Sequence, residues 1–512
     1  MLVKTFGCAV HGIHATLVTV ETNISGGVFL YMVGLPDSAV KESQHRIGAA
    51  LKNIGLKIPG KGVTINMAPA DIRKEGTAYD LTTAIGILAA DDKVKSEKLE
   101  NFVIMGELSL DGELRPIKGV LPIAIEAKER GFKGIILPLQ NAQEAASVGG
   151  LEVYGIENIR EVISFLNGET TIAPVKINIQ EEFFSLLGKS DLDFSDVKGQ
   201  ENIKRALEIA AAGGHNVIMI GPPGSGKTMI AKRLPTILPP LTIEESLETT
   251  KIHSVAGKMG KEKSLVTARP FRSPHHTISD VALVGGGSFP QPGEISLAHH
   301  GVLFLDELPE FSRNVLEVMR QPLEDRVVTI SRAKFSVEYP ASFMLVSAMN
   351  PCPCGYYNHP EKECVCAPGI VQKYLNKISG PLLDRIDIHV EVTPVAFSEL
   401  SSERKAEPSE KIRERVMNAR KIQSGRFANN AGTFCNAQMS SNTLRSICKI
   451  DEGGQTLLKN AMEKLGLSAR AYDRILKVAR TIADLESSDT IQNQHLAEAI
   501  QYRSLDRDNW GG

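Results

Sequence analysis

The sequence lacks long apolar runs and has few aromatic residues. Only one of its 512 residues is tryptophan, and aromatic side chains make up 5% of the total. No apolar run approaches the roughly 18–20 residues that a membrane helix needs. The N-terminus, MLVKTFGCAVHG, also lacks the basic and apolar segments of a secretory signal. We therefore expect a cytoplasmic protein with no membrane contact.

Neither sign of charge is in clear excess. The sequence contains 58 lysine and arginine residues and 60 acidic residues, which gives a formal net charge of −2. A protein that attracts DNA or an anionic membrane over its whole surface needs a strong positive excess. Any contact with nucleic acid must therefore come from a local surface.

Cysteine is scarce, and the count of seven is odd. Four of the seven form two C-x-C pairs separated by nine residues: Cys352, Cys354, Cys364 and Cys366. Four thiolates at this spacing can enclose a tetrahedral zinc ion, with His359 in the spacer as a substitute ligand. The alternative is four reduced cysteines in a loop. A catalytic metal is not expected, because four thiolates leave no open coordination position.

The length favours about three or four domains. In residues 1–166, short apolar runs alternate with helical stretches, which predicts an α/β domain. Residues 167–196 are polar and irregular, so we expect a linker. Residues 197–394 open with helix, strand and glycine-rich loop, the pattern of a nucleotide-binding α/β domain. Helical periodicity dominates residues 395–512 and predicts a helical bundle.

One segment has the pattern of a phosphate-binding loop. GPPGSGKT follows the apolar strand VIMI and precedes a helix, which is the context that the motif requires. Backbone N–H groups of such a loop wrap the phosphates of ATP, Lys227 reaches the β- and γ-phosphates, and Thr228 binds Mg²⁺. The predicted nucleotide-binding residues are Gly221, Pro222, Pro223, Gly224, Ser225, Gly226, Lys227 and Thr228.

Two further strands end in polar side chains. GVLFLDEL ends in Asp306, suited to Mg²⁺, and Glu307, suited to polarising the attacking water. SFMLVSAMN ends at Asn350, which we predict to sense the γ-phosphate or the water. The alternative for Asn350 is a strand-end cap before Pro351. The two adjacent acids predict hydrolysis of ATP rather than binding alone.

Several segments together resemble one family. GPPGSGKT, GVLFLDELPEF, SAMNPCPCGY, SGPLLDRIDIHVEV and LSARAYDRILKVARTIADL resemble the YifB/ComM family of magnesium-chelatase-like AAA+ ATPases over essentially the whole chain. The resemblance implies a ring, commonly a hexamer, with ATP between neighbouring subunits. It also implies that Arg385 is an arginine finger and that Arg470 is the sensor of a helical lid. Arg474 lies one turn after Arg470 and stays an alternative for the sensor. For the finger and for the sensor, the other explanation is a surface salt bridge.

The resemblance implies an ATP-driven DNA motor that promotes branch migration during DNA uptake and integration. A magnesium-chelatase subunit and a protein-remodelling ATPase are the alternatives.

A long insert between the P-loop helix and Asp306 carries His275–His276 and His299–His300. We expect these histidines near the nucleotide or the pore rather than at a metal. A predicted hairpin places Arg332 and Lys334 at its tip, as DNA contacts or as solvated residues.

The N-terminal segment is similar to the Lon-protease-type domain, an α+β fold of the S5 domain 2 type. Lon-like proteases use a serine–lysine dyad. The serine position corresponds to Ala78 and the lysine position falls near Leu121, so neither side chain can perform the reaction. Thr77 offers a hydroxyl, but no lysine stands at the matching second position. We therefore expect a scaffold rather than a peptidase.

Overall fold

The computed structural model describes residues 2–186, 191–260, 264–287, 290–332, 335–359, 361–395, 406–428, 430 and 432–503. The chain divides into two compact units. The first comprises Met1–Leu186, Thr242–Thr267 and Ala333–Tyr339, and the second comprises Leu187–Leu241, Ala268–Arg332 and Pro340–Gly512. Among the described helices, none is long and apolar enough to cross a membrane.

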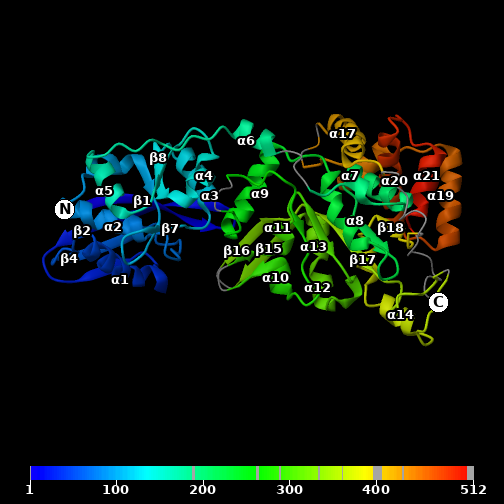
Figure 1. The fold of residues 1–512 in the computed structure, drawn as a ribbon, viewed down its shortest axis with the longest axis horizontal. Coiled ribbons are helices and arrows are strands. Elements are labelled where there is room, and N and C mark those ends of the chain that lie inside the picture. The colour runs from blue at the N-terminus through cyan, green and yellow to red at the C-terminus, as the bar shows by residue number, and fades with distance from the viewer. Residues whose placement is uncertain are drawn as a thin grey trace. The chain divides into compact units, whose positions relative to one another are not determined.

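The first unit contains a seven-stranded mixed sheet (Figure 1). Strands β1 and β2 form a long antiparallel hairpin, and the other neighbours in the order β3-β4-β2-β1-β5-β8-β9 are parallel apart from β2 and β4. The strand bounds are β1 (Leu2–His11), β2 (His14–Ser25), β3 (Leu30–Val33), β4 (Gly62–Ala68), β5 (Phe102–Ile104), β8 (Gly134–Pro138) and β9 (Glu152–Ile156).

Helices cover this sheet through an apolar core. Helix α2 (Asp80–Ala90) contacts β1 and β2 and is buried along its whole length. It approaches closely because Gly86 has no side chain, and a β-carbon there would fall 2.7 Å from Thr22 Oγ1. The remaining helices of this region are α1 (Ser38–Asn53), α3 (Val120–Glu129), α4 (Ala142–Ala146), α5 (Ile159–Asn167) and α6 (Ile179–Leu186).

A segment from the middle of the chain also belongs to the first unit. Helix α9 (Ile243–Val255) packs against α3, although the sequence pattern places it inside the nucleotide-binding region. Ser254 accepts a hydrogen bond from Gly119 N through its carbonyl oxygen at 3.1 Å, and its hydroxyl lies 3.4 Å from Leu121 N. Glu144 accepts from Leu121 N at 3.0 Å, and burial raises its pKa. These polar contacts tie α9 to the amino end of α3.

The second unit is built on a five-stranded parallel sheet in the order β11-β14-β17-β10-β18. The three central strands are buried at every residue, which is expected when helices cover both faces. The strands are β10 (Val217–Ile220), β11 (Phe271–Arg272), β14 (Val302–Leu305), β17 (Met344–Met349) and β18 (Ile388–Glu391).

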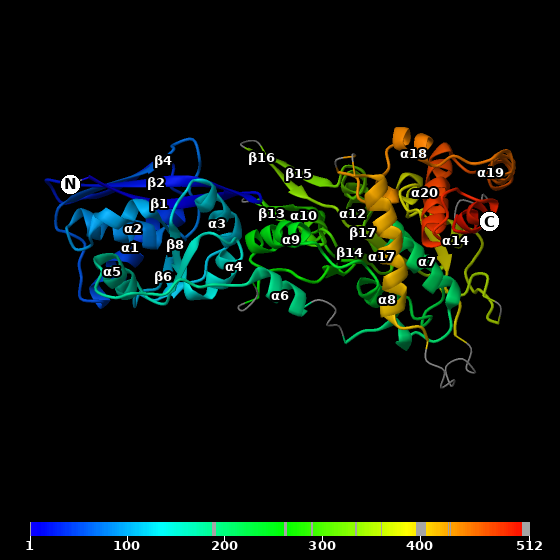
Figure 2. The same ribbon diagram turned by 90° about the horizontal axis from the view of Figure 1, so that it is seen from above.

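The C-terminal helices complete the second unit. Figure 2 shows α17 (Ser409–Arg426) and α20 (Ala469–Leu485) beside α7 (Glu201–Gly213), and their apolar side chains share one cluster with β10. The predicted helical bundle therefore packs against α7, which in turn contacts β18. Its other helices are α18 (Ser441–Ile447), α19 (Glu452–Leu465) and α21 (Asn493–Gln501).

Local elements differ from the prediction at three places. Strands β1 and β9 were not predicted, and helix α6 lies inside the segment predicted as an irregular linker. The predicted hairpin corresponds to β15 (Val327–Arg332) and β16 (Phe335–Pro340) of a two-stranded sheet. Lys334 and the side chain of Arg332 lie outside the described residues, so their predicted DNA contacts stay predictions.

Candidate ATP-hydrolysis site

The P-loop connects β10 to helix α8 (Lys227–Arg233). Gly224 and Gly226 have φ angles of +76° and +86°, a left-handed conformation that side chains disfavour. These two glycines let the backbone turn back on itself, so that its N–H groups can face a phosphate. Gln200 supports the loop from outside, because its side-chain amide donates to Ser225 O at 2.9 Å and Thr393 O at 2.8 Å.

Lys227 lies inside this loop and is only 8% exposed. Its ammonium donates to Gly221 O at 2.7 Å, to Pro222 O at 2.9 Å and to Asn350 Oδ1 at 3.3 Å. Burial lowers the pKa of Lys227, and the charges of Asp306 and Glu307 oppose that shift. The contact with Asn350 brings together two residues that are 123 positions apart.

Thr228 and the two acids form the second half of the site. The Thr228 hydroxyl donates to Asp306 Oδ2 at 2.6 Å, and the other oxygen of Asp306 accepts from Glu307 N at 2.9 Å. The backbone of Glu307 is left-handed, with φ +52°. The site is thus a lysine, a hydroxyl, two carboxylates and an amide at one edge of the sheet.

The order of the strands explains why these residues meet. Strand β17 lies between β10 and β14, and all three are parallel. Their carboxyl ends therefore share one edge, where Lys227 follows β10, Asp306 follows β14 and Asn350 follows β17. Ligands of open parallel sheets bind at this edge.

The predicted finger and the two candidate lid sensors, Arg385, Arg470 and Arg474, each pair with an acidic residue of the same chain. Arg385 Nη2 lies 2.6 Å from Glu324 Oε1, and Arg470 Nη1 lies 3.3 Å from Asp384 Oδ2. Arg385 is 12% exposed at its side chain, whereas Arg470 is 63% exposed. Arg470 is therefore the more accessible of these two to a ligand or a neighbouring subunit.

Arg474, the alternative lid sensor, is held by a buried carboxylate. Its Nη1 lies 2.8 Å from Asp387 Oδ1, and Asp387 is 1% exposed. Burial alone would raise the pKa of Asp387, but Arg474 and the hydrogen bond from His215 hold it well below its ordinary value. Removing one partner of such a pair leaves a buried charge, which costs about 3–5 kcal/mol. Arg474 therefore stabilises the fold through its pair with Asp387, whereas Arg470 pairs with Asp384 at an exposed site.

The four clustered cysteines lie together. Cys352 Sγ is 3.3 Å from Cys354 Sγ and 3.7 Å from Cys364 Sγ, and all four sulfurs lie within 4.8 Å of one another. Four ligands at about 2.3 Å around a tetrahedral zinc would be separated by about 3.8 Å, so the donor set fits zinc. His359 is outside this group and accepts from Glu361 N at 3.1 Å.

The cysteine loop adjoins the P-loop. Cys352 is fully buried and follows Asn350 by two residues. Gly355 has φ +86°, and a β-carbon built there would fall 2.4 Å from Pro223 Cδ. A metal that fixes this loop would therefore also support Pro223 and Asn350.

The two histidine pairs have different surroundings. His276 Nδ1 lies 3.4 Å from Glu307 Oε2, a contact that the sequence pattern did not reveal. His299 is 3% exposed, and its Nδ1 accepts from Ser342 N at 2.9 Å. His300 N donates to Ser342 O at 2.7 Å, so the second pair fixes the backbone before β17.

The two residues predicted at the positions of the Lon-type dyad carry no reactive group. They are Ala78 and Leu121, and Leu121 is fully buried. The hydroxyl of Thr77 donates to Glu107, and the buried ammonium of Lys74 donates to Pro69 O. Neither residue has the serine–lysine arrangement that nucleophilic catalysis requires.

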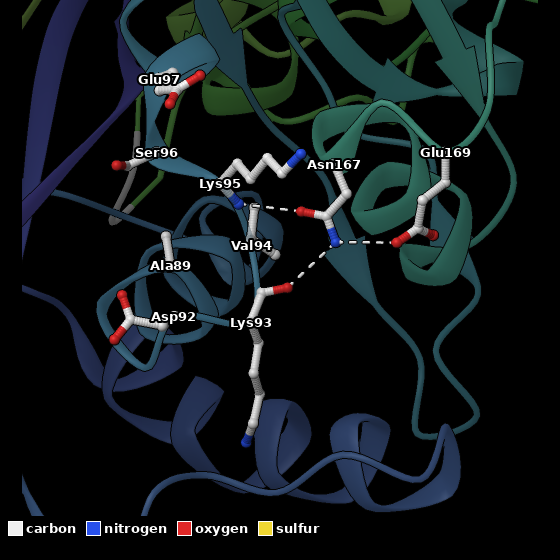
Figure 3. Close-up of a pocket in the computed structure, with 9 residues that line it drawn as sticks. All are labelled: Ala89, Asp92, Lys93, Val94, Lys95, Ser96, Glu97, Asn167 and Glu169. Carbon is white, nitrogen blue, oxygen red and sulfur yellow. Dashed lines mark hydrogen bonds between the residues drawn. The ribbon is translucent and has the colours of Figure 1, made fainter.

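A polar pocket in the first unit is separate from the P-loop (Figure 3). The Asn167 side chain spans it, accepting from Lys95 N at 3.0 Å and donating to Lys93 O at 3.3 Å. These bonds fix the end of α5 to the loop after α2. We assign the pocket a structural role.

Comparisons with known proteins now decide the family. Models described as magnesium chelatase, subunit ChlI, match residues 193–400, 20–141 and, for its C-terminal part, 406–503. The chain is 45% identical to competence protein ComM of Haemophilus influenzae over 97% of this chain and 96% of that one. The chain belongs to the YifB/ComM family of magnesium-chelatase-like proteins.

One further relative supports this placement, and another matches only part of the chain. The protein YifB of Escherichia coli is 44% identical over 97% of this chain and 96% of its own length. Lon protease 2 of Bacillus subtilis is 32% identical over 149 residues, which cover 28% of this chain and 26% of that protein. The family makes this chain a magnesium-chelatase-type AAA ATPase, for which ATP and Mg²⁺ are implied. The hydroxyl–carboxylate pair of Thr228 and Asp306 fits Mg²⁺, since both offer oxygen ligands.

Proposed function

We propose that this chain is a ring-forming DNA motor that hydrolyses ATP at the P-loop site and promotes branch migration of recombination intermediates during DNA uptake and integration. The observation that carries the ATPase part is the cluster of Lys227, Asn350, Thr228, Asp306 and Glu307 at one sheet edge. The DNA part rests on the close relative, whose name describes a competence protein.

Each residue of the cluster has a distinct task. Lys227 exchanges its hydrogen bonds with Gly221 O and Pro222 O for bonds to the β- and γ-phosphates of ATP. Thr228 and Asp306 would hold Mg²⁺, which neutralises charge on the phosphate oxygens. Glu307 polarises the attacking water, and Asn350 binds the γ-phosphate or that water.

Two arginines complete the site in a ring, which we propose to be a hexamer. Arg385 acts on the γ-phosphate of the neighbouring subunit's ATP, and arginine fingers contribute about 10³–10⁵ in rate. In this role, Arg385 breaks its ion pair with Glu324 and binds the γ-phosphate instead. Arg470 acts from the lid and reports nucleotide binding through its exposed guanidinium.

The N-terminal domain serves as a scaffold without peptidase activity. The likeness to a Lon protease extends over 149 residues, and Ala78 and Leu121 stand at the predicted positions of the dyad. The ATPase site is thus the catalytic centre on which the proposed motor depends.

DNA stimulation of ATP turnover tests this function. We expect single-stranded or forked DNA to raise the steady-state rate of the purified protein several-fold, because motors couple hydrolysis to their track. The measurement is phosphate release with and without each DNA, at equal ionic strength, since phosphate contacts depend on salt. If neither forked DNA nor a four-way junction raises turnover or is processed, the motor function is wrong while the nucleotide assignments survive.

Zinc in the cysteine loop is a separate proposal with its own prediction. Purified protein should contain one zinc per chain, and Cys352→Ser should lose it, because three thiolates bind zinc less tightly than four. The measurement is metal analysis by mass spectrometry after dialysis. Cys448→Ser, a buried cysteine outside the cluster, is the matched control and should keep the metal. Wild-type protein without stoichiometric zinc would refute the site.

A further inference from the structure

The RSPHH segment lies beside the carboxyl end of β14. Strand β11 pairs with β14 in parallel, with Phe271 opposite Val302 and Arg272 opposite Leu303. Residues that follow β11 therefore lie at the same sheet edge as residues that follow β14. This pairing explains why His276 reaches Glu307, although 31 positions separate them in sequence.

The ring of His276 is held by its neighbours. Its centroid lies 4.1 Å from that of His275 and 6.4 Å from that of Phe311, whose ring stands nearly perpendicular at 79°. Phe311 is 4% exposed and fixed in the core. The His276 side chain keeps 31% exposure, and that of Glu307 keeps 57%. Water can therefore reach the side chains of His276 and Glu307, which is necessary if Glu307 is to polarise a water molecule.

The backbone on either side of His276 is anchored. Arg272 donates to both oxygens of Glu294, at 2.6 and 2.7 Å, in a bidentate pair. Ser279 caps helix α10 (Asp280–Val284) by accepting from Ala282 N at 3.2 Å. A bidentate arginine pair fixes geometry more tightly than a single contact. The segment therefore presents His276 from two fixed ends.

We propose that His276 is a positioning residue for ATP hydrolysis, which donates from Nδ1 to Glu307 Oε2 and leaves Oε1 to polarise the attacking water. The proposal rests on the proposed role of Glu307 as the base. An unrestrained glutamate side chain samples many rotamers, and a hydrogen bond to one oxygen selects those in which the other faces the water. This donation requires the tautomer that carries its proton on Nδ1.

The neighbouring histidine provides a matched control. His275 Nδ1 lies 3.0 Å from Thr277 Oγ1 and accepts from Thr277 N at 3.4 Å, so it serves the local turn rather than Glu307. His275→Phe keeps an aromatic ring against His276 but removes these polar contacts. His276→Phe keeps the ring packing on Phe311 but removes the donor.

The test compares kcat and KM for ATP, with nucleotide affinity measured separately by a fluorescent ATP analogue. His276→Phe should lower kcat about tenfold while KM and affinity change less than about twofold, because only the orientation of the base is lost. His276→Asn, whose amide N–H occupies nearly the place of Nδ1, should recover most of kcat. His275→Phe should match the wild type.

A double-mutant cycle shows whether His276 acts through Glu307. In the Glu307→Gln background, His276→Phe should cause no further loss of the residual rate. Unchanged or raised kcat in His276→Phe, a failure of His276→Asn to recover it, or an equal additional loss in the Glu307→Gln background would each overturn the proposal. A wild-type protein without ATPase activity would instead overturn the proposed function, so the two failures are distinguishable.

Discussion

Replacing Lys227 with alanine is expected to abolish ATP binding and hydrolysis. The ammonium of Lys227 is nearly buried and donates to Gly221 O, Pro222 O and Asn350 Oδ1. It is therefore already placed where the phosphates must arrive. Charge-assisted hydrogen bonds contribute about 1.5–3 kcal/mol each, so losing two of them lowers affinity by about 100-fold or more.

Isothermal titration with ATP and Mg²⁺ checks this expectation. Lys232→Ala is the matched control, because Lys232 lies on the same helix α8 but is exposed. The control should bind ATP like the wild type, whereas Lys227→Ala should show no saturable heat. ATP binding by Lys227→Ala within a few-fold of the wild type would contradict the assignment of the P-loop.

Replacing Glu307 with glutamine is expected to separate binding from hydrolysis. The glutamine amide keeps the size of the side chain but cannot polarise water as a carboxylate does. Loss of a general base lowers the rate by about 10²–10⁴-fold. ATP affinity should stay within about twofold, because Lys227, Thr228 and Asp306 are unchanged. The variant should therefore accumulate in its ATP-bound form.

Single-turnover hydrolysis and nucleotide titration on the same preparation measure both quantities. Glu310→Gln serves as the control, since Glu310 lies three residues further on and pairs with Lys377 on the surface at 3.4 Å. This control should keep full activity. An active Glu307→Gln protein would show that another group activates the water.

Much of the candidate site could be predicted from the sequence because each residue follows a recognisable strand. The apolar runs before Gly221, Asp306 and Asn350 are confirmed as β10, β14 and β17. Parallel strands then bring their carboxyl ends together, whatever the length of chain between them. The functional roles of these residues stay predictions until the variants are measured.

Other features depend on tertiary pairing that periodicity does not reveal. The contact of His276 with Glu307 follows from the pairing of a two-residue strand, β11, which is too short to show a pattern. Strand β9 has only five residues, EVYGI, which are too few to show a clear apolar alternation. The different surroundings of Arg470 and Arg474 also required the structure, because Asp387 is buried and Asp384 is not, and the lid-sensor role itself stays a prediction.

The packing of α9 with the N-terminal domain is another feature that the sequence pattern did not reveal. Its sequence is weakly amphipathic, and buried threonine and serine side chains bond within the helix and to Val266. Contact with α3 depends on Ser254 and the buried Glu144, which are polar residues. Because hydrophobic periodicity is the main signal for predicting secondary structure from sequence, it does not reveal a polar contact of this kind.

The most direct test of the central claim is ATP-dependent processing of a synthetic four-way DNA junction. Wild-type protein with ATP and Mg²⁺ should convert a labelled junction with homologous arms into two duplexes. Glu307→Gln should bind ATP but leave the junction intact, which would show that hydrolysis at this site moves the DNA. If the wild-type protein hydrolyses ATP yet leaves junctions and forks unchanged, or if Glu307→Gln processes them at the wild-type rate, the proposed ATP-driven DNA motor is contradicted.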